Sequence, residues 1–409
     1  MTGAPAPAGA ANLVVAGGRR GTWAEWTAPV TAGGGVPPVA AVLAPDSVAA
    51  VEAVCRHLRG DRETLVAAAG RVDGQMAEQL RGDGFAIVRG HEVTPPLTER
   101  AADPGRLWLL TSGSTGRPKR VEHSLSSLTT VAGDQPPRRW LCPYSFGAYA
   151  WWQLVTLSLA HPGQDVVFVE PAELDAWPQV ALAEGVTAVS GTPTFWRQAL
   201  LRSGETVARL PLTQVTLGGE PVDQAVLDRL AALFPEARIS WIYASSEAGA
   251  TIAVHDRRAG FPVAWLDLHA AGRPGLAVAD GELVIDSPWS ARGLGGPLRT
   301  GDRAEVVDDR VLITGRIASD EINVGGAKVS ASTVREVLQA HPAVVWAQVR
   351  GRRAPLVGQV VVADVVLDGE VATDELTAWC AARLPEQSVP RRLSVLADIP
   401  IKETLKSDV

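Results

Sequence analysis

One stretch of this chain limits its possible folds more than any other, because an apolar run changes abruptly into hydroxyl and glycine residues. Leu107–Leu110 suits a buried strand, and positions 111–119 then read Thr-Ser-Gly-Ser-Thr-Gly-Arg-Pro-Lys. The two glycines allow backbone N–H groups to approach a bound group, the hydroxyls add donors, and Lys119 adds a positive charge. The pattern predicts a strand, a loop suited to phosphate oxygens, and a second strand.

Two other interpretations of this loop fit less well. Ser/Gly runs are usually flexible linkers, but a linker has no reason to follow a buried strand and to end in Pro-Lys. A P-loop has four residues between its glycines and enters a helix at its lysine. Here two residues separate Gly113 from Gly116, and Pro118 precedes Lys119.

Length and composition limit what surrounds the loop. A chain of 409 residues with 46% hydrophobic and 20% charged residues is expected to form more than one domain, each with a core. A net charge of −7 argues against a nucleic-acid-binding surface. The cysteines Cys55, Cys142 and Cys380 are too far apart to indicate disulfides or a zinc site. With no signal-peptide pattern and no membrane-length apolar run, we expect a reduced, cytoplasmic setting.

The order of predicted elements indicates an α/β fold. Strands alternate with helices from Val39 onwards, which implies parallel sheets flanked by helices. From about Gly281 strands joined by turns predominate, and a small α+β unit follows Arg316. We therefore predict a large domain over residues 1–316, with residues 1–12 disordered, and a small domain over residues 317–409.

Two further segments place ligand-binding residue types after strands. Tyr243 and Glu247 come just past the end of a predicted strand, where ligands collect in open α/β sheets. A tyrosine ring can stack on a nucleobase and a carboxylate oxygen suits Mg²⁺, although a capped loop with a solvated glutamate fits equally well. Residues 218–221 read Gly-Gly-Glu-Pro, which allows the backbone to approach a flat ring or forms an ordinary tight turn.

Two more motifs each contribute one charged side chain, a carboxylate and a guanidinium. Asp302 follows Thr300-Gly301, and Arg316 follows Gly315 at the end of a later strand. A carboxylate can accept hydrogen bonds from a ribose diol, and arginine supplies donors. A hairpin with charged surface residues is the alternative interpretation.

Together these segments resemble the motifs of the adenylate-forming superfamily, which includes acyl-CoA synthetases, aryl-acid ligases, adenylation domains and luciferases. Residues 111–119 match its pattern Thr-Ser-Gly-Ser/Thr-Thr-Gly-x-Pro-Lys, and residues 243–247 are similar to Tyr-Gly-x-Thr-Glu. The resemblance implies that Tyr243 flanks the adenine and that Glu247 holds Mg²⁺. It implies nucleotide binding by Thr111, Ser112, Gly113, Ser114, Thr115, Gly116, Lys119, Gly219, Glu220, Pro221, Tyr243, Asp302 and Arg316.

The resemblance also implies a fold and a catalytic lysine. The large domain would contain a distorted β-barrel-like part, and a hinge after Arg316 would join it to a small mobile C-terminal domain. Residues 400–406 resemble Pro-x-Thr-x-x-Gly-Lys, which places Lys406 at the catalytic lysine. Lys402 stands where the family has Thr and Leu405 replaces Gly, so Lys402 is a rival.

The implied reaction has two steps and uses ATP, Mg²⁺ and a thiol. A carboxylate attacks the α-phosphorus of ATP and pyrophosphate leaves, with Thr111, Glu247 and Lys406 as catalytic residues. Domain rotation then admits the thiol, for which CoA is the first expectation. The alternatives are an enzyme that loads the phosphopantetheine of a carrier protein or an amine, and an inactive nucleotide-binding scaffold. The sequence does not predict an oligomeric state.

The expected substrate is an aryl or medium-sized apolar carboxylic acid. Amino-acid-activating members resemble Ser-Phe-Asp-Ala-Ser where this chain has Gly147, and a buried ammonium without a counter-charge is costly. Only about 110 residues precede the phosphate loop, fewer than the family usually has, so we expect an acid pocket that is enlarged, exposed, or completed in part by a partner. Its predicted lining is Tyr144, Phe146, Gly147, Gly191, Phe195, Trp241 and Ser245.

Overall fold

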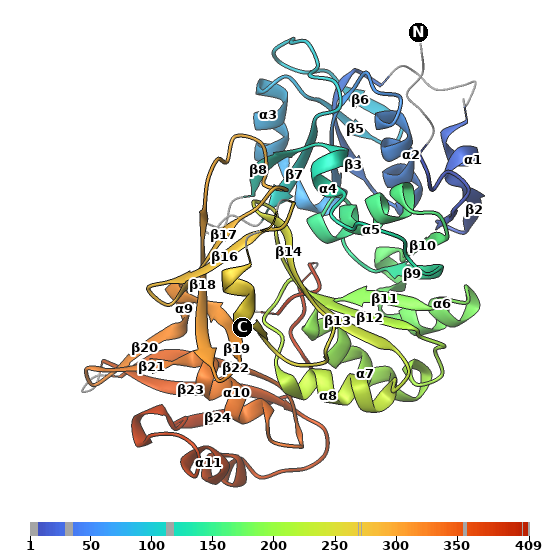
Figure 1. Ribbon diagram of the computed structural model, residues 1–409. Helices are drawn as coiled ribbons and strands as arrows, with labels where there is room; N and C mark the ends of the chain where they lie inside the picture. Colours follow the sequence, from blue (N-terminus) through green and yellow to red (C-terminus); the bar gives the residue numbers. More distant parts are fainter. Residues whose placement is uncertain are drawn as a thin grey trace.

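The computed structural model describes residues 7–28, 36–111, 118–268, 270, 272–354, 358–402 and 404–407, with only the backbone of Ser319. Four sheets build the described part of the chain, two of them mainly parallel and flanked by helices (Figure 1). The predicted α/β class is therefore confirmed.

The six-stranded sheet carries the strands on either side of the phosphate loop, in the order β6-β5-β3-β4-β7-β8. Its strands are β3 (Val39–Ala44), β4 (Glu63–Ala68), β5 (Ala86–Arg89), β6 (Glu92–Thr94), β7 (Leu107–Thr111) and β8 (Lys119–His123), with helices α2 (Ser47–His57) and α3 (Gly74–Gly82). Every residue of β3 is buried, as expected of a central parallel strand. β7 and β8 pair antiparallel with Thr111 opposite Lys119, which confirms the predicted strand–loop–strand arrangement.

The eight-stranded sheet has the order β14-β13-β12-β11-β9-β10-β1-β2. Its strands are β1 (Leu13–Ala16), β2 (Arg19–Thr22), β9 (Arg138–Cys142), β10 (Gln164–Phe168), β11 (Ala188–Gly191), β12 (Gln214–Gly218), β13 (Arg238–Ser245) and β14 (Gly249–Val254). The associated helices are α1 (Trp23–Thr27), α4 (Leu125–Leu128), α5 (Tyr149–Ala160), α6 (Trp177–Ala183), α7 (Pro193–Val207) and α8 (Gln224–Leu233). Strands β9 to β13 are parallel, so their carboxyl ends meet at one edge.

The rest of the chain forms two smaller sheets. An antiparallel sheet in the order β15-β19-β18-β17-β16 lies where a barrel-like part is expected. Its strands are β15 (Phe261–Pro262), β16 (Gly275–Ala279), β17 (Glu282–Asp286), β18 (Leu298–Val307) and β19 (Arg310–Arg316). After the single turn α9 (Ile317–Asp320), the last sheet contains β20 (Glu321–Val324), β21 (Ala327–Ser330), β22 (Val344–Ala354), β23 (Gly358–Leu367) and β24 (Arg392–Leu396), with α10 (Ala331–Gln339) and α11 (Thr373–Ala381).

The N-terminal segment differs from the prediction over residues 7–12, which are ordered rather than disordered. The side chain of Asn12 is buried, donates to the carbonyls of Ser158 and His161, and accepts from the Gly163 N–H at 2.7 Å. This network anchors β1, which pairs with β10 and which the sequence analysis missed. A single asparagine with three hydrogen bonds thus orders a segment whose composition resembles a flexible tail.

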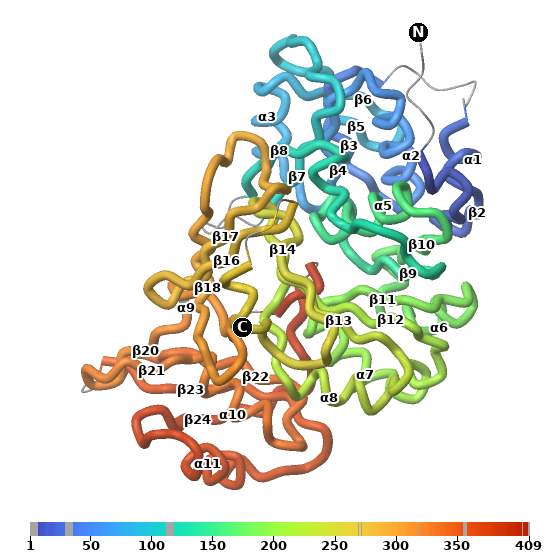
Figure 2. Tube along the Cα trace, viewed as in Figure 1, coloured from blue at the N-terminus to red at the C-terminus, as the bar shows by residue number. Residues whose placement is uncertain are grey.

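Of the four buried apolar clusters among the described residues, the two largest fit the two-domain prediction. The larger core joins residues of the first three sheets, whereas a second core consists of residues between Ile322 and Leu384. Figure 2 shows that the red C-terminal end leaves the small unit and lies beside the green elements of the eight-stranded sheet. The boundary at Arg316 remains a prediction. Among the described residues, no helix is long and apolar enough to span a membrane.

Candidate active site

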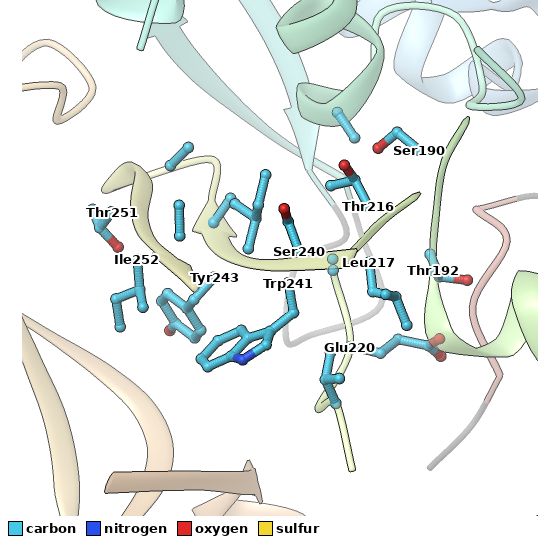
Figure 3. Close-up of a pocket in the computed structure, with 18 of the residues that line it drawn as sticks. Ser190, Thr192, Thr216, Leu217, Glu220, Ser240, Trp241, Tyr243, Thr251 and Ile252 are labelled. Carbon is cyan, nitrogen blue, oxygen red and sulfur yellow. The ribbon is translucent and has the colours of Figure 1, made fainter. Parts of the chain in front are cut away.

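A cavity of about 1350 Å³ lies at the carboxyl ends of the parallel strands of the eight-stranded sheet. This is the edge at which open α/β sheets place their ligands. Strand β13 divides the cavity, because Tyr243 and Trp241 point to one side of the strand and Ser240 to the other (Figure 3). The predicted site residues that line it are Thr111, Tyr144, Gly219, Glu220, Pro221, Trp241, Tyr243, Ser245, Glu247, Asp302, Arg316 and Lys406.

The predicted phosphate loop is only partly visible. Thr111 lines the cavity at the end of β7, whereas Ser112, Gly113, Ser114, Thr115 and Gly116 lie outside the described residues. Lys119 is exposed and lies beside a different, smaller hollow outside the cavity lining, and its nucleotide contact stays a prediction. Arg71, by contrast, lines the cavity and brings a positive charge to it. Its Nη2 donates to the Leu110 carbonyl at 3.1 Å.

Tyr243, Asp302 and Arg316 form one hydrogen-bonded group although they come from three strands. The Tyr243 hydroxyl donates to Asp302 Oδ2, and Arg316 Nε lies 3.0 Å from Asp302 Oδ1. Burial raises the pKa of Asp302, while the hydrogen bond from Tyr243 and the charges of Arg316 and Lys406 oppose this shift. The motifs predicted to hold adenine and ribose are therefore brought together, with the carboxylate already paired.

Glu247 offers one carboxylate to the cavity, in the loop between β13 and β14. Among the described residues no three His, Cys, Asp or Glu side chains gather as a protein-only metal site. Magnesium does not need one, since it is commonly held by one or two carboxylates together with substrate phosphates and water. The residues present therefore fit a Mg²⁺ ion that arrives with a nucleotide.

The C-terminal lysines lie in different places. Lys406 lines the cavity, and a Cβ added to Gly219 would lie 3.2 Å from Lys406 Cε. Lys402 is exposed and does not line the cavity. Burial lowers the pKa of Lys406, and the carboxylates of Glu220 and Asp302 oppose this shift. The geometry thus favours Lys406 over its rival.

Glu220 holds the segment that carries Lys406. One oxygen of its carboxylate accepts from the Ser407 N–H at 2.9 Å, and both oxygens accept from Thr194 at 3.0 Å. The sequence analysis assigned Glu220 to the adenine edge, but in the structure its carboxylate is directed at α7 and at the C-terminal segment. We call residues 404–407 the C-terminal tail.

Two further contacts fix the tail on both sides. The buried hydroxyl of Thr192 donates to the Leu405 carbonyl, and the Ser407 hydroxyl lies 2.8 Å from Thr194 Oγ1. Trp346 of the small unit donates its indole N–H to the same Ser407 hydroxyl at 2.9 Å. Leu405 adopts a φ of 60°, a left-handed conformation that explains why a glycine is typical at this position of the motif.

Four residues predicted to line the acid pocket belong to the core instead. The Phe146 ring packs against Trp151 at 6.5 Å between centroids, and a Cβ on Gly147 would meet the Val66 carbonyl oxygen at 1.8 Å. Gly191 packs against the Phe195 ring, which in turn lies 4.9 Å from that of Trp177. Phe146, Gly147, Gly191 and Phe195 do not line the cavity, because close packing against other residues occupies these positions.

The sequence analysis missed several residues at or beside the site. They are Arg71, Thr192, Thr194 and the buried His123, whose Nε2 lies 2.7 Å from the Ser246 carbonyl oxygen. His123 sits in β8, directly after the phosphate-loop segment, and thereby supports the loop that contains Glu247. Thr192 and Thr194 followed a predicted strand end, which was the available clue.

Two family models cover most of the chain. The model for AMP-binding enzymes matches residues 36–294, and the model for the C-terminal domain of these enzymes matches residues 334–406. The chain belongs to the AMP-binding enzyme family. The predicted superfamily resemblance is thereby confirmed.

Curated relatives share about a quarter of their residues with this chain. A 2-succinylbenzoate–CoA ligase of Bacillus cytotoxicus is 27% identical over 321 residues, covering 71% of this chain and 66% of the relative. A 4-chlorobenzoate–CoA ligase of Arthrobacter sp. is 29% identical over 374 residues, covering 81% of this chain and 68% of the relative. The chain thus spans about two thirds of the length of these relatives.

Solved structures agree with the fold. An E. coli MenE variant with bound OSB-AMS has a TM-score of 0.73 at 18% identity, with 95% of this chain and 93% of that chain covered. The amide bond synthetase McbA from Marinactinospora thermotolerans has a TM-score of 0.69 at 21% identity, with 98% and 96% covered. At these identities the likeness concerns the fold alone.

Proposed function

We propose that this protein activates an aryl or similar non-amino carboxylic acid with ATP, releases pyrophosphate, and transfers the acyl group from the resulting adenylate to CoA. The observation that carries the proposal is the position of Lys406. Its side chain enters the cavity beside Gly219, and the charges of Glu220 and Asp302 act on it. The names of the two curated relatives, both CoA ligases of aryl acids, support the same reaction.

The acid would approach the reacting end from the side of β13 that carries Ser240. Tyr144 lies there, buried, with its hydroxyl 3.0 Å from Ser190 Oγ. The carboxylates among the described lining residues are Glu220, Asp223, Glu247, Asp302 and Glu336. Position 147, where amino-acid-activating members carry an aspartate, is a glycine packed against the Val66 carbonyl, which supports the exclusion of α-amino acids.

The residues act mainly by positioning and by charge. The Lys406 ammonium would lie between the incoming carboxylate and the α-phosphate and stabilise the negative charge that builds up as the P–O bond forms. Asp302 and Arg316 would orient the ribose, and the Thr111 hydroxyl would donate to phosphate oxygens. Mg²⁺, when bound with the nucleotide, supplies charge neutralisation on the phosphates, and Glu247 is the residue that would hold it.

Transfer to the thiol requires Lys406 to leave the cavity. In this structure the tail is docked, so the described arrangement suits the first step. The hairpin turn at Gly325-Gly326 between β20 and β21 lies outside the cavity lining, and we propose that it lines the path of the thiol after domain rotation. The short α9 turn directly after Arg316 is where we place the pivot.

The experiment is an assay of pyrophosphate release with ATP, Mg²⁺ and a panel of benzoates, followed by mass spectrometry after CoA is added. We expect acid-dependent pyrophosphate and an acyl-CoA product, and we expect Lys406→Ala to slow both by about 100-fold or more. An adenylate without a thioester would favour a carrier protein or an amine as acceptor. ATP binding without pyrophosphate release from any acid would instead identify a nucleotide-binding scaffold and overturn the proposal.

A further inference from the structure

The cavity extends from the reacting end along one face of the eight-stranded sheet, towards the amino ends of the strands. Its lining includes alternate residues of β12 and β13, which share one face because side chains alternate along a strand. Figure 3 shows Thr216 and Ser240 on this face, opposite to Trp241 and Tyr243. Gly218 marks the reacting end and Gln214 the far end, about 13 Å away at about 3.3 Å per residue.

This face is polar where an apolar acid pocket was expected. Gln214 and Ser240 are 4% and 2% exposed, yet both line the cavity. The Gln214 amide donates to the Ser240 hydroxyl at 2.9 Å, and that hydroxyl lies 2.8 Å from His255 Nδ1. These groups satisfy one another by hydrogen bonds, so this part of the cavity keeps a polar wall at little cost. The wall therefore suits an acid that carries a polar group beyond its reacting end.

Three basic side chains converge at the far end of the cavity. Arg238 begins β13 directly opposite Gln214, Arg138 begins β9, and both line the cavity together with His255. Arg138 Nε is buried and has no hydrogen-bond partner in the part of the chain that the structure describes. Among the described residues, no carboxylate comes within ion-pair distance of Arg138 or Arg238, although Arg139, the next residue, pairs with Asp165.

The charges at this end repel one another. Burial and the charge of Arg238 lower the pKa of Arg138. Burial and the charge of Arg238 likewise lower the pKa of His255, whereas Asp256 raises it. Arg258 also lines the cavity, but its guanidinium is bonded to Asp309. Positive charges held close together without a counter-ion repel one another, and a bound anion would reduce this repulsion.

We propose that Arg138 and Arg238 bind a second anionic group of the acid substrate, so that the substrate class is a dicarboxylic acid whose far carboxylate lies about 10 Å or more from the carboxylate that reacts. This inference rests on the proposed function, since it names the acid that the same cavity activates. Arg238 and His255 are exposed at the open end, and Arg138 is half-buried, so the far carboxylate would be bound near the surface.

The test compares two acids that differ only in the far group: the para-linked biphenyl dicarboxylate and biphenyl monocarboxylate. The steady-state kcat/KM for pyrophosphate release is measured with both acids, and binding of both is measured by calorimetry without ATP. We expect the dicarboxylate to be preferred about 10-fold or more, and Arg238→Gln and Arg138→Gln each to reduce that preference about 10-fold. Arg238→Lys should retain part of it.

The matched control is Arg392→Gln, which changes an exposed arginine at the start of β24, outside the cavity. It should leave the preference unchanged. Equal kcat/KM for both acids, or a loss on both acids alike in the arginine variants, would overturn the inference while the proposed function stands. Arginine-dependent binding of the dicarboxylate without pyrophosphate release would support the inference and overturn the proposed function.

Discussion

The two ends of the cavity are built in opposite ways. At the reacting end two carboxylates already have partners within the chain: Asp302 pairs with Arg316, and Glu220 accepts from the tail that carries Lys406. At the far end, Arg138 and Arg238 face the cavity without a carboxylate among the described residues. The protein thus assembles its catalytic groups before a ligand arrives, whereas the far end is completed by the ligand. The preassembled groups at the reacting end favour a fast reaction, and the two arginines at the far end favour one class of substrate over others.

The largest effect is expected from removing the ammonium at the reacting end. Lys406→Ala should lower the rate of acid-dependent pyrophosphate release by about 100- to 1000-fold, because a preorganised charge at the transition state is lost. Lys402→Ala is the matched control and should change the rate less than about 2-fold. A larger loss in Lys402→Ala than in Lys406→Ala would reverse the assignment of the two lysines.

A smaller effect is expected from breaking the ion pair between Asp302 and Arg316. Asp302→Asn keeps an acceptor for the Tyr243 hydroxyl but removes the ion pair with Arg316. A hydrogen bond to a charged group contributes about 1.5–3 kcal/mol, so kcat/KM for ATP should fall about 10- to 100-fold. The kcat/KM for the acid, measured at saturating ATP, should change less. An equal loss for both substrates would mean that Asp302 supports the whole fold rather than nucleotide binding.

A substitution of Glu220 should affect the two half-reactions differently. Glu220→Gln retains an oxygen for the Ser407 N–H but loses the negative charge near Lys406. We expect adenylate formation to slow by about 10-fold, because the tail is held less firmly in the cavity. Transfer from a supplied acyl-adenylate to CoA should stay within about 2-fold, since the tail must leave for that step. Equal slowing of both half-reactions would contradict a docking role.

The smallest effect concerns pH. Because burial lowers the pKa of Lys406, the rate of adenylate formation should fall as pH rises through a value below the ordinary lysine pKa of about 10.4. A lysine with a lowered pKa binds fewer protons in the folded state than in the unfolded state. Its contribution to the free energy of unfolding therefore increases as pH rises, so unfolding does not explain this loss of rate. In Lys406→Arg the alkaline decline should disappear, since guanidinium stays charged. An unchanged decline would assign it to another group.

The sequence predicted those parts that depend on local chemistry. The strand–loop–strand arrangement around Thr111 followed from its local pattern, whereas the roles of Lys406, Tyr243, Asp302 and Arg316 followed from the family resemblance. The family assignment made from the same motifs is confirmed.

The parts that failed depend on packing between distant segments. Gly147 looked like a pocket residue, but only the fold shows that it lies against the Val66 carbonyl. The order of residues 7–12 depends on Asn12 reaching the end of α5, which composition cannot reveal. The docking of Glu220 on the tail joins residues 187 positions apart, and the meeting of Arg138 with Arg238 requires knowledge of the strand order.

The central claim is that the acid attacks the innermost phosphorus of ATP, and an isotope measurement tests it most directly. The purified protein is supplied with ATP, Mg²⁺, CoA and an aryl acid whose carboxylate carries heavy oxygen. Attack at the α-phosphorus followed by thiol transfer breaks the bond between carbon and the bridging oxygen, so the AMP must retain one heavy oxygen. We predict labelled AMP and unlabelled pyrophosphate. Label in inorganic phosphate, or AMP without label, would contradict the account.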